Sequence, residues 1–407
     1  MDVAAARQRL LAAYAGALEA VDGTAATRRA LVSDRFSSAV DVVAVGKAAV
    51  AMAHGARQAL GEGVRRLFIV TKGGHGDEAL FARPDVTGLE AAHPVPDASS
   101  LAAGAALVEF LATGPADREV VFLVSGGTSS LVERLRPGLD QALLERANAW
   151  LLGSGLGIHD VNRVRRALSA IKGGRLVPHL RGRPVRVLLI SDVPGNRVES
   201  IGSGLLHQAP TDALDDLDLP GWLRDAVAGG EPVAGSATAT IPHHIIADNA
   251  RAVAAARDRA VASGLEVHLH EEFLEGDAVS LGHELLSAPP AARGLHLWGG
   301  ETTVRLPPRP GRGGRCQALA LAAARAGAGR DDWCLLAAGT DGSDGPGGDA
   351  GALVDGNTVA RGELAGFDAA GSLATADAGT FLEASGDLLH TGPTGTNVMD
   401  LVMLWQQ

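Results

Sequence analysis

The chain of 407 residues has few aromatic side chains, which make up 3% of it, and only two cysteines, Cys316 and Cys334. With so few large rings, the core must be built from Val, Leu, Ile and Ala packed closely across helices and sheets. Two cysteines can form at most one intrachain disulfide and cannot make a four-cysteine zinc site. We therefore expect two reduced thiols in a cytoplasmic protein.

The chain also has no excess of positive charge, because its formal net charge is −11 and its pI is near 5.6. Proteins that bind nucleic acids or anionic membranes need basic surfaces, so neither partner is expected. No stretch approaches the roughly 18 apolar residues that would suggest a membrane span. A small anionic substrate fits this charge, since an arginine cluster can lie within an acidic protein.

The stretch RQRLLAAYAGALEA places two arginines before an alanine-rich run, as a short signal peptide would. Leu10, Tyr14 and Leu18 nevertheless fall on one helical face. This spacing favours an amphipathic first helix.

Short apolar runs rich in β-branched residues alternate with longer helical patterns. This alternation is typical of β-α-β units and largely parallel sheets. The expected strands are residues 41–46, 66–71, 118–125, 185–191, 243–248, 265–270, 295–300 and 333–340. Because the length exceeds what one core usually serves, we expect two domains. A stretch rich in Pro, Gly and acidic residues places their boundary near residue 235, giving domains of residues 1–235 and 236–407, with residues 1–30 able to pack on the second.

Only three of the 36 basic residues are lysines, namely Lys47, Lys72 and Lys172. Lysine and arginine exchange freely on a solvated surface but not where a compact ammonium is required, so each remaining lysine is a functional candidate. Lys47 and Lys72 follow expected strands, where parallel sheets bind ligands. Lys172 lies at a helix end before a glycine, where capping of the last helical carbonyl groups is the alternative.

The segment VVFLVSGGTSSLVERL runs from a strand through a glycine- and serine-rich turn into a helix. Glycines let the backbone approach a ligand, and amides with hydroxyl groups bind anions such as phosphate. We therefore expect a nucleotide-phosphate site formed by Ser125, Gly126, Gly127, Thr128 and Ser129. A helix cap with a tight turn is the alternative. The turn lacks the G-x-x-x-x-G-K-[ST] pattern, so a P-loop fold is not implied.

Further candidates follow along the chain. Asn162 and Arg165 share a helix whose basic face could meet an anion, although a solvated face fits as well. Asp192 directly follows a buried strand, where a carboxylate can cap a helix, bind a metal or act as a base. Arg315 begins a helix, where the helix dipole disfavours a cation unless an anion lies nearby.

The loop GTDGSDGPGGD places Asp341 and Asp344 after a strand. Their oxygen atoms suit magnesium, and the spacing does not fit the EF-hand calcium loop. An Asp- and Gly-rich turn without a metal is the alternative.

Taken in order, these segments resemble the type II glycerate 2-kinases, a family sometimes labelled hydroxypyruvate reductases. The resemblance extends from about residue 40 to the C-terminus. It is carried by VAVGKAA, TKGGHG, AAHPVPDASS, LVSGGTSSL, NRVRRALSAIKGGRL, ISDVPGN, GGETTV, GGRCQALAL, GTDGSDGP and TGPTGTNVMDL.

This resemblance implies a Rossmann-like, mostly parallel N-terminal domain and a smaller C-terminal α/β (MOFRL-type) domain, with the active site in the cleft. It implies transfer of the γ-phosphoryl group of ATP, with Mg²⁺, to the 2-hydroxyl of D-glycerate, giving 2-phospho-D-glycerate. The catalytic lysine and arginine of the family match Lys47 and Arg315, and Asp192 and Asp341 match metal or base positions.

These matches lead to a hypothesis for the site. Lys47 and Arg315 contact the transferring phosphoryl group, and Asp192 orients or deprotonates the acceptor hydroxyl. The acid is bound by Lys72, Arg165 and Asn162, and the metal by Asp341 and Asp344. The chain departs from the expected family pattern at Asn196, Arg197, Cys316, Ala318 and Met399.

Three alternatives stay open. Another small hydroxy or sugar acid could be the acceptor. An NAD(P)H-dependent hydroxypyruvate reductase would need a G-x-G-x-x-G fingerprint, which VAVGKAAVAMAHGA lacks. A non-catalytic binding protein would not need a magnesium-type loop and two cations. The oligomeric state is left open, a homodimer included.

Overall fold

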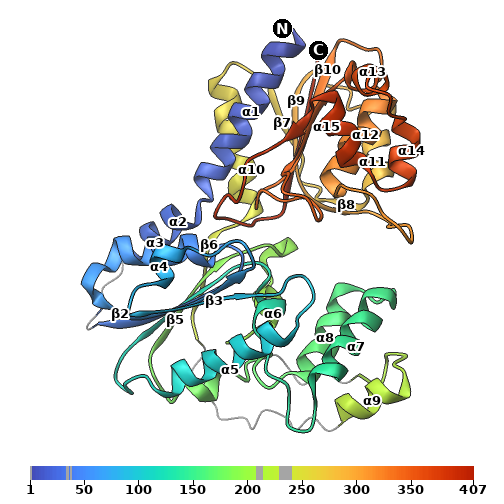
Figure 1. Ribbon diagram of the computed structural model, residues 1–407. Helices are drawn as coiled ribbons and strands as arrows, with labels where there is room; N and C mark the ends of the chain where they lie inside the picture. Colours follow the sequence, from blue (N-terminus) through green and yellow to red (C-terminus); the bar gives the residue numbers. More distant parts are fainter. Residues whose placement is uncertain (1, 34–35, 37–38, 208–213, 229–240) are drawn as a thin grey trace. The chain divides into compact units, whose positions relative to one another are not determined.

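The computed structural model describes residues 2–33, 36, 39–207, 214–228 and 241–407 (Figure 1). They form two compact α/β units, Gly23–Ile246 and Met1–Asp22 with Ala247–Gln407. The prediction of two α/β domains is confirmed, whereas the expected boundary near residue 235 lies outside the described residues. None of the described helices is long and apolar enough to cross a membrane.

The first unit, Gly23–Ile246, is built on a six-stranded sheet in the order β3-β2-β1-β4-β5-β6. The strands are Val40–Val45 (β1), Val64–Lys72 (β2), Val86–Ala91 (β3), Val120–Val124 (β4), Val185–Ile190 (β5) and His243–Ala247 (β6). β1 pairs in parallel with β2 and β4, which confirms the predicted parallel sheet. β1 and β4 are buried along their whole length, because helices cover both faces of such a sheet. Their sequences therefore read as continuous apolar runs.

Helices cover this sheet from two sides (Figure 1). α3 packs on β1 and β2, and α5 packs on β2 and β3 from the opposite face. α7, α8 and α9 form a separate small cluster around residues such as Ala147, Val164 and Leu223. The helices are Gly23–Val32 (α2), Ala49–Leu60 (α3), Glu78–Phe81 (α4), Ala98–Ala112 (α5), Thr128–Leu131 (α6), Gln141–Gly153 (α7), Ile158–Leu168 (α8) and Gly221–Ala228 (α9), with short 3-10 turns at Gly61–Gly63, Val177–Leu180, Pro194–Asn196 and Ile201–Ser203.

The second unit contains a sheet in the order β12-β11-β10-β13-β9-β7, with β8 also paired to β9. The strands are Val267–Leu269 (β7), Leu274–Asp277 (β8), Gly294–Thr303 (β9), Trp333–Gly339 (β10), Gly351–Asp355 (β11), Leu388–Leu389 (β12) and Asp400–Gln406 (β13). β10 is antiparallel to β11 and β13, and β13 is antiparallel to β9, whereas β7 and β8 run parallel to β9. The expectation of largely parallel sheets is therefore wrong for this unit. An apolar run identifies a strand but not the direction of its neighbour.

The helices of the second unit pack closely. α1 lies beside α10 (Figure 1) and also contacts β10, where the Tyr14 hydroxyl donates to the Gly339 carbonyl at 2.6 Å. α11 and α12 approach so closely that a Cβ on Gly282 would lie 2.1 Å from the Leu319 carbonyl oxygen. The helices are Val3–Ala20 (α1), Asn249–Ala262 (α10), Ala278–Ser287 (α11), Arg315–Ala326 (α12), Thr358–Leu364 (α13), Ala369–Ala374 (α14) and Ala378–Ser385 (α15).

Candidate active site

The loops that follow β1 and β4 are joined at Gly46. Its φ of +130° is one that side chains rarely adopt, and a Cβ there would lie 2.1 Å from the Ser125 hydroxyl oxygen. The next amide, that of Lys47, donates to the Gly126 carbonyl at 2.9 Å. The Ser125 hydroxyl in turn accepts from the Ala48 amide at 3.1 Å. Only glycine at residue 46 permits this approach, which fixes Lys47 beside the turn after β4.

The hydroxyl groups of that turn differ in what they can offer a ligand. Ser125 and Thr128 are completely buried. The Thr128 hydroxyl donates to the carbonyl groups of Val45 at 2.9 Å and Ser125 at 2.7 Å. These two hydroxyl groups hold the loops together, whereas the Ser129 hydroxyl lies 2.7 Å from that of Ser203 and lines a pocket.

Gly126 and Gly127 supply the backbone that a ligand can approach. Gly127 has a φ of +84°, and a Cβ on it would lie 3.0 Å from the His93 ring and 3.3 Å from Cγ of Lys47. Lys47, Gly127 and His93 are therefore neighbours. The sequence analysis did not include His93 among the candidates, although the residue stands in the quoted segment AAHPVPDASS.

Two further candidates lie at the same edge of the first sheet. Lys72 is the last residue of β2, and Asp192 is the second residue after β5. Both are partly exposed. Because parallel strands end at one edge, the sheet brings both residues to the edge that carries Lys47.

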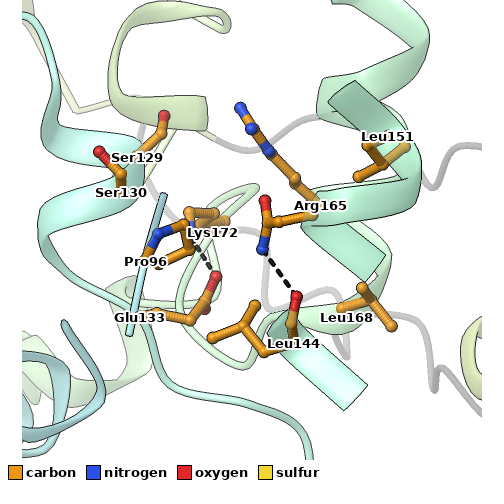
Figure 2. A pocket seen from close by; sticks show the side chains of 10 residues that line it. Pro96, Ser129, Ser130, Glu133, Leu144, Leu151, Arg165, Leu168 and Lys172 are labelled. Atoms are coloured by element: carbon orange, nitrogen blue, oxygen red, sulfur yellow. Dashed lines mark hydrogen bonds and ion pairs between the residues drawn. The ribbon is translucent and has the colours of Figure 1, made fainter. Parts of the chain in front are cut away.

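A narrow pocket lies between this edge and the helices α7 and α8 (Figure 2). Its cavity volume is about 10 Å³, close to what one water molecule needs. Ser129 lines it from the turn after β4, and Arg165 lines it from α8. The structure thus brings a predicted nucleotide-binding residue and a predicted substrate-binding residue to one pocket. Asn162 is buried on α8, one turn before Arg165.

The Arg165 guanidinium forms no hydrogen bond or ion pair with any part of the chain that the structure describes. Burial lowers the pKa of Arg165, and the negative charge of Glu133 opposes this shift. A half-buried guanidinium that makes no hydrogen bond or ion pair within the described residues is a suitable partner for an anion.

Lys172 does not cap α8, so the capping alternative is wrong. α8 ends at Leu168, and the Lys172 ammonium makes a buried ion pair with Glu133. Arg175 bonds the end of the helix instead, because its Nη1 donates to the Arg166 carbonyl at 2.9 Å. Burial lowers the pKa of Lys172, and Glu133 opposes this shift. Glu133 lies 39 residues away in the chain, and the sequence analysis gave it no role.

In the second unit, Arg315 begins α12, as predicted. The anions beside it are two carboxylates of the same unit, those of Asp400 and Glu301. Its Nε and Nη2 donate to both carboxylate oxygens of Asp400, at 2.6 and 2.9 Å, and its Nη1 donates to Glu301 at 3.1 Å. Asp400 opposes Gly300 on one side and Gly339 on the other, so the sheet register fixes its position. Asp400 lies in the quoted segment TGPTGTNVMDL, and sequence reasoning gave it no role.

The two aspartates predicted to bind magnesium differ. Both carboxylate oxygens of Asp344 accept amide hydrogen bonds at the start of α12, from Cys316 at 3.1 Å and Gln317 at 2.8 Å. Burial and the charge of Asp400 raise the pKa of Asp344 to about 7. Asp344 is thus a helix cap that does not fit the role of a metal ligand. One oxygen of Asp341 accepts from the Ser343 amide at 2.9 Å, in a local turn.

No group of three or more His, Cys, Asp or Glu side chains within the described residues is arranged to hold a metal ion. Magnesium commonly uses one or two carboxylates together with substrate phosphates. Because Asp344 caps α12, Asp341 is what remains of the predicted pair, and its role as a magnesium ligand stays a prediction.

Sequence comparisons match both units to known families. Residues 9–219 match a domain of unknown function, DUF4147, and residues 294–400 match the MOFRL family. The chain is 34% identical over 381 residues to the D-glycerate 2-kinase of Thermotoga maritima, covering 89% of this chain and 90% of the relative. The chain belongs to the type II glycerate 2-kinase family.

Other relatives align with this chain over a similar share of its length. The glycerate 2-kinase of Pyrococcus horikoshii is 33% identical over 388 residues, covering 89% of this chain and 86% of the relative. A relative from Agrobacterium vitis carries the name hydroxypyruvate reductase. It is 37% identical over 382 residues, which cover 88% of this chain and 85% of the relative. The crystal structure of the Thermotoga maritima glycerate kinase superposes with a TM-score of 0.84 at 31% identity, covering 99% of this chain and all of that one.

Proposed function

We propose that this chain is a glycerate 2-kinase, which transfers the γ-phosphoryl group of ATP to the 2-hydroxyl of D-glycerate and releases 2-phospho-D-glycerate. The observation that carries the proposal is the backbone hydrogen bond from Lys47 to Gly126, which fixes Lys47 at the turn whose Ser129 lines the pocket that contains Arg165. A lysine next to a glycine-rich turn suits phosphate groups, and a half-buried arginine suits a carboxylate. The names of the relatives in Thermotoga maritima and Pyrococcus horikoshii supply the substrate.

Phosphoryl transfer depends on positioning and on neutralising charge more than on covalent chemistry. Lys47 would place its ammonium against the transferring phosphoryl group. The backbone of Gly126 and Gly127 and the Ser129 hydroxyl would bind the nucleotide phosphates, while Ser125 and Thr128 act by shaping the turn. We separate these two roles because the hydroxyl groups of Ser125 and Thr128 are buried and already hydrogen-bonded to the backbone.

The acid would be held by its carboxylate. Arg165 can offer two parallel N–H donors, and Asn162 and Lys72 would support it. Asp192 would accept the proton of the 2-hydroxyl or hold that hydroxyl in line with the phosphoryl group.

Arg315 would act as a fixed cation whose position Asp400 sets. The two carboxylates around it more than balance its charge, so phosphate contact would require Glu301, whose side chain is 39% exposed, to move aside.

Mg²⁺ would neutralise phosphate charge when it is bound with the nucleotide, and Asp341 is the predicted ligand that remains for it. Two buried free thiols, Cys316 and Cys334, support the proposed cytoplasmic location.

One coupled assay tests the proposal. ADP release is measured with ATP and Mg²⁺ across D-glycerate, L-glycerate, hydroxypyruvate, tartronate and four-carbon sugar acids. We expect the highest kcat/KM with D-glycerate. Preference for another acid would change the substrate, and no ADP with any acid would exclude the kinase. A parallel measurement of NADH oxidation with hydroxypyruvate tests the reductase suggested by the name of the Agrobacterium vitis relative.

A further inference from the structure

The Glu133 carboxylate lines the same pocket as Arg165. Its ion pair and its hydrogen bonds are made to residues other than Arg165. One oxygen forms the ion pair with Lys172, and the other accepts from the Ser169 hydroxyl at 2.6 Å and the Arg134 amide at 2.9 Å. The side chains of Glu133 and Lys172 are 3% and 1% exposed. Figure 2 shows the two groups facing each other.

Arg165 is the second cation of this pocket. Its guanidinium has no hydrogen bond or ion pair among the described residues, and in Figure 2 it points away from the Glu133–Lys172 pair. Glu133 is still close enough for its charge to act on Arg165. The pocket therefore holds a carboxylate and a guanidinium that do not pair with each other.

The charges explain why the ammonium of Lys172 matters. Glu133, Lys172 and Arg165 together carry one positive charge in excess, which an anionic ligand would balance. Without Lys172, the Glu133 carboxylate would be buried and unpaired, a costly state that pairing with Arg165 would relieve. Such pairing would occupy the donors that the substrate needs.

We propose that Lys172 is a positioning residue, which holds Glu133 so that Arg165 stays open to the carboxylate of the acid substrate. This inference rests on the proposed function, because it takes Arg165 as the carboxylate-binding residue. A compact ammonium fits against Glu133 in a nearly filled pocket, where the planar fork of arginine would need more room. This requirement explains one of the three lysines in an arginine-rich chain.

The test compares Arg165→Ala, Lys172→Met and the double variant Glu133→Gln/Lys172→Met in the full chain. The readouts are the KM for D-glycerate and the KM for ATP from ADP release. We expect Arg165→Ala and Lys172→Met each to raise the KM for D-glycerate about tenfold or more, the loss typical of a hydrogen bond to a charged group. The KM for ATP should stay within about twofold, because the pocket serves the acid. The double variant should return the KM for D-glycerate to within about threefold of the wild type, since no carboxylate is left to occupy Arg165.

The double variant can still overturn the inference if Lys172→Met does not fold, because replacing both members of the Glu133–Lys172 pair leaves neither of their charges buried and unpaired. Circular dichroism and thermal unfolding establish that it is folded. A folded double variant with the high KM of Arg165→Ala would overturn the inference and leave the proposed function standing. An unchanged KM in Arg165→Ala would instead show that Arg165 does not bind the acid, and both proposals for this pocket would fall.

Discussion

Arg315 and Asp400 form an ion pair with two hydrogen bonds, in which Nε lies 2.6 Å from Oδ2 and Nη2 lies 2.9 Å from Oδ1. The Asp400 side chain is only 4% exposed, whereas that of Arg315 is 33% exposed. A cation at a helix start opposes the helix dipole, and the carboxylate offsets this cost. The pair joins the start of α12 to the start of β13.

Removing the charge of Asp400 should destabilise the second unit. Asp400→Asn keeps one side-chain oxygen that can accept from Arg315 but removes the negative charge and the second acceptor oxygen. We expect the free energy of unfolding to fall by about 3 kcal/mol, as for a buried pair that loses one charged partner. Glu301→Gln is the matched control, because Glu301 is a more exposed partner of the same arginine and should cost less than about 1 kcal/mol. Urea unfolding measures both. Equal losses in the two variants would contradict this ranking.

Asp344 should make stability depend on pH. Burial and Asp400 raise its pKa from 3.8 to about 7, so the folded state holds more protons than the unfolded state between these values. The contribution of Asp344 is therefore full below about pH 4 and is lost as pH rises to 7, by at most about 4 kcal/mol. Urea unfolding at about pH 5 and pH 8 measures this loss. Asp344→Asn should show a smaller loss, and an unchanged loss in that variant would assign the effect to other groups.

Gly46 should not tolerate a side chain. Gly46→Ala forces a Cβ to within 2.1 Å of the Ser125 hydroxyl oxygen and 2.7 Å of its carbonyl oxygen, at a φ of +130°. We expect a loss of about 3 kcal/mol or more, together with loss of activity, because the loops after β1 and β4 must separate. Gly73→Ala is the control, because nothing lies within 4 Å of its Cβ and its φ is ordinary. Thermal unfolding and the ADP assay should find Gly73→Ala close to wild type.

Lys47 should matter for turnover and little for folding. Lys47→Ala removes the ammonium of a side chain whose stem lies beside Gly127. We expect kcat to fall by about 100-fold or more, as when one preorganised donor is lost from a transition state. Arg65→Ala removes an exposed cation at the other end of β2 and should leave kcat within about twofold. Near-normal kcat in Lys47→Ala would remove Lys47 from the mechanism, provided that thermal unfolding matches the wild type.

Most strands of the first unit could be predicted from sequence because they are continuous apolar runs. β3, Val86–Ala91, was missed, since its partly exposed residues do not form such a run. β6 was expected in the second domain but pairs beside β5 in the first sheet. β13 was also missed, and it lies between β9 and β10 in antiparallel register. Pairing partners and strand direction depend on contacts far apart in the chain, which local periodicity does not encode.

The sequence by itself determined the class of fold, the strand-end positions of Lys47 and Lys72, and the family, because residue type, period and motif order are local properties. The tertiary structure decided which charges meet. It showed that Arg315 already has an internal anion in Asp400, that Asp344 caps a helix, and that Lys172 pairs with Glu133. These outcomes depend on distances between residues that are remote in sequence, and electrostatic energies depend on distance and burial.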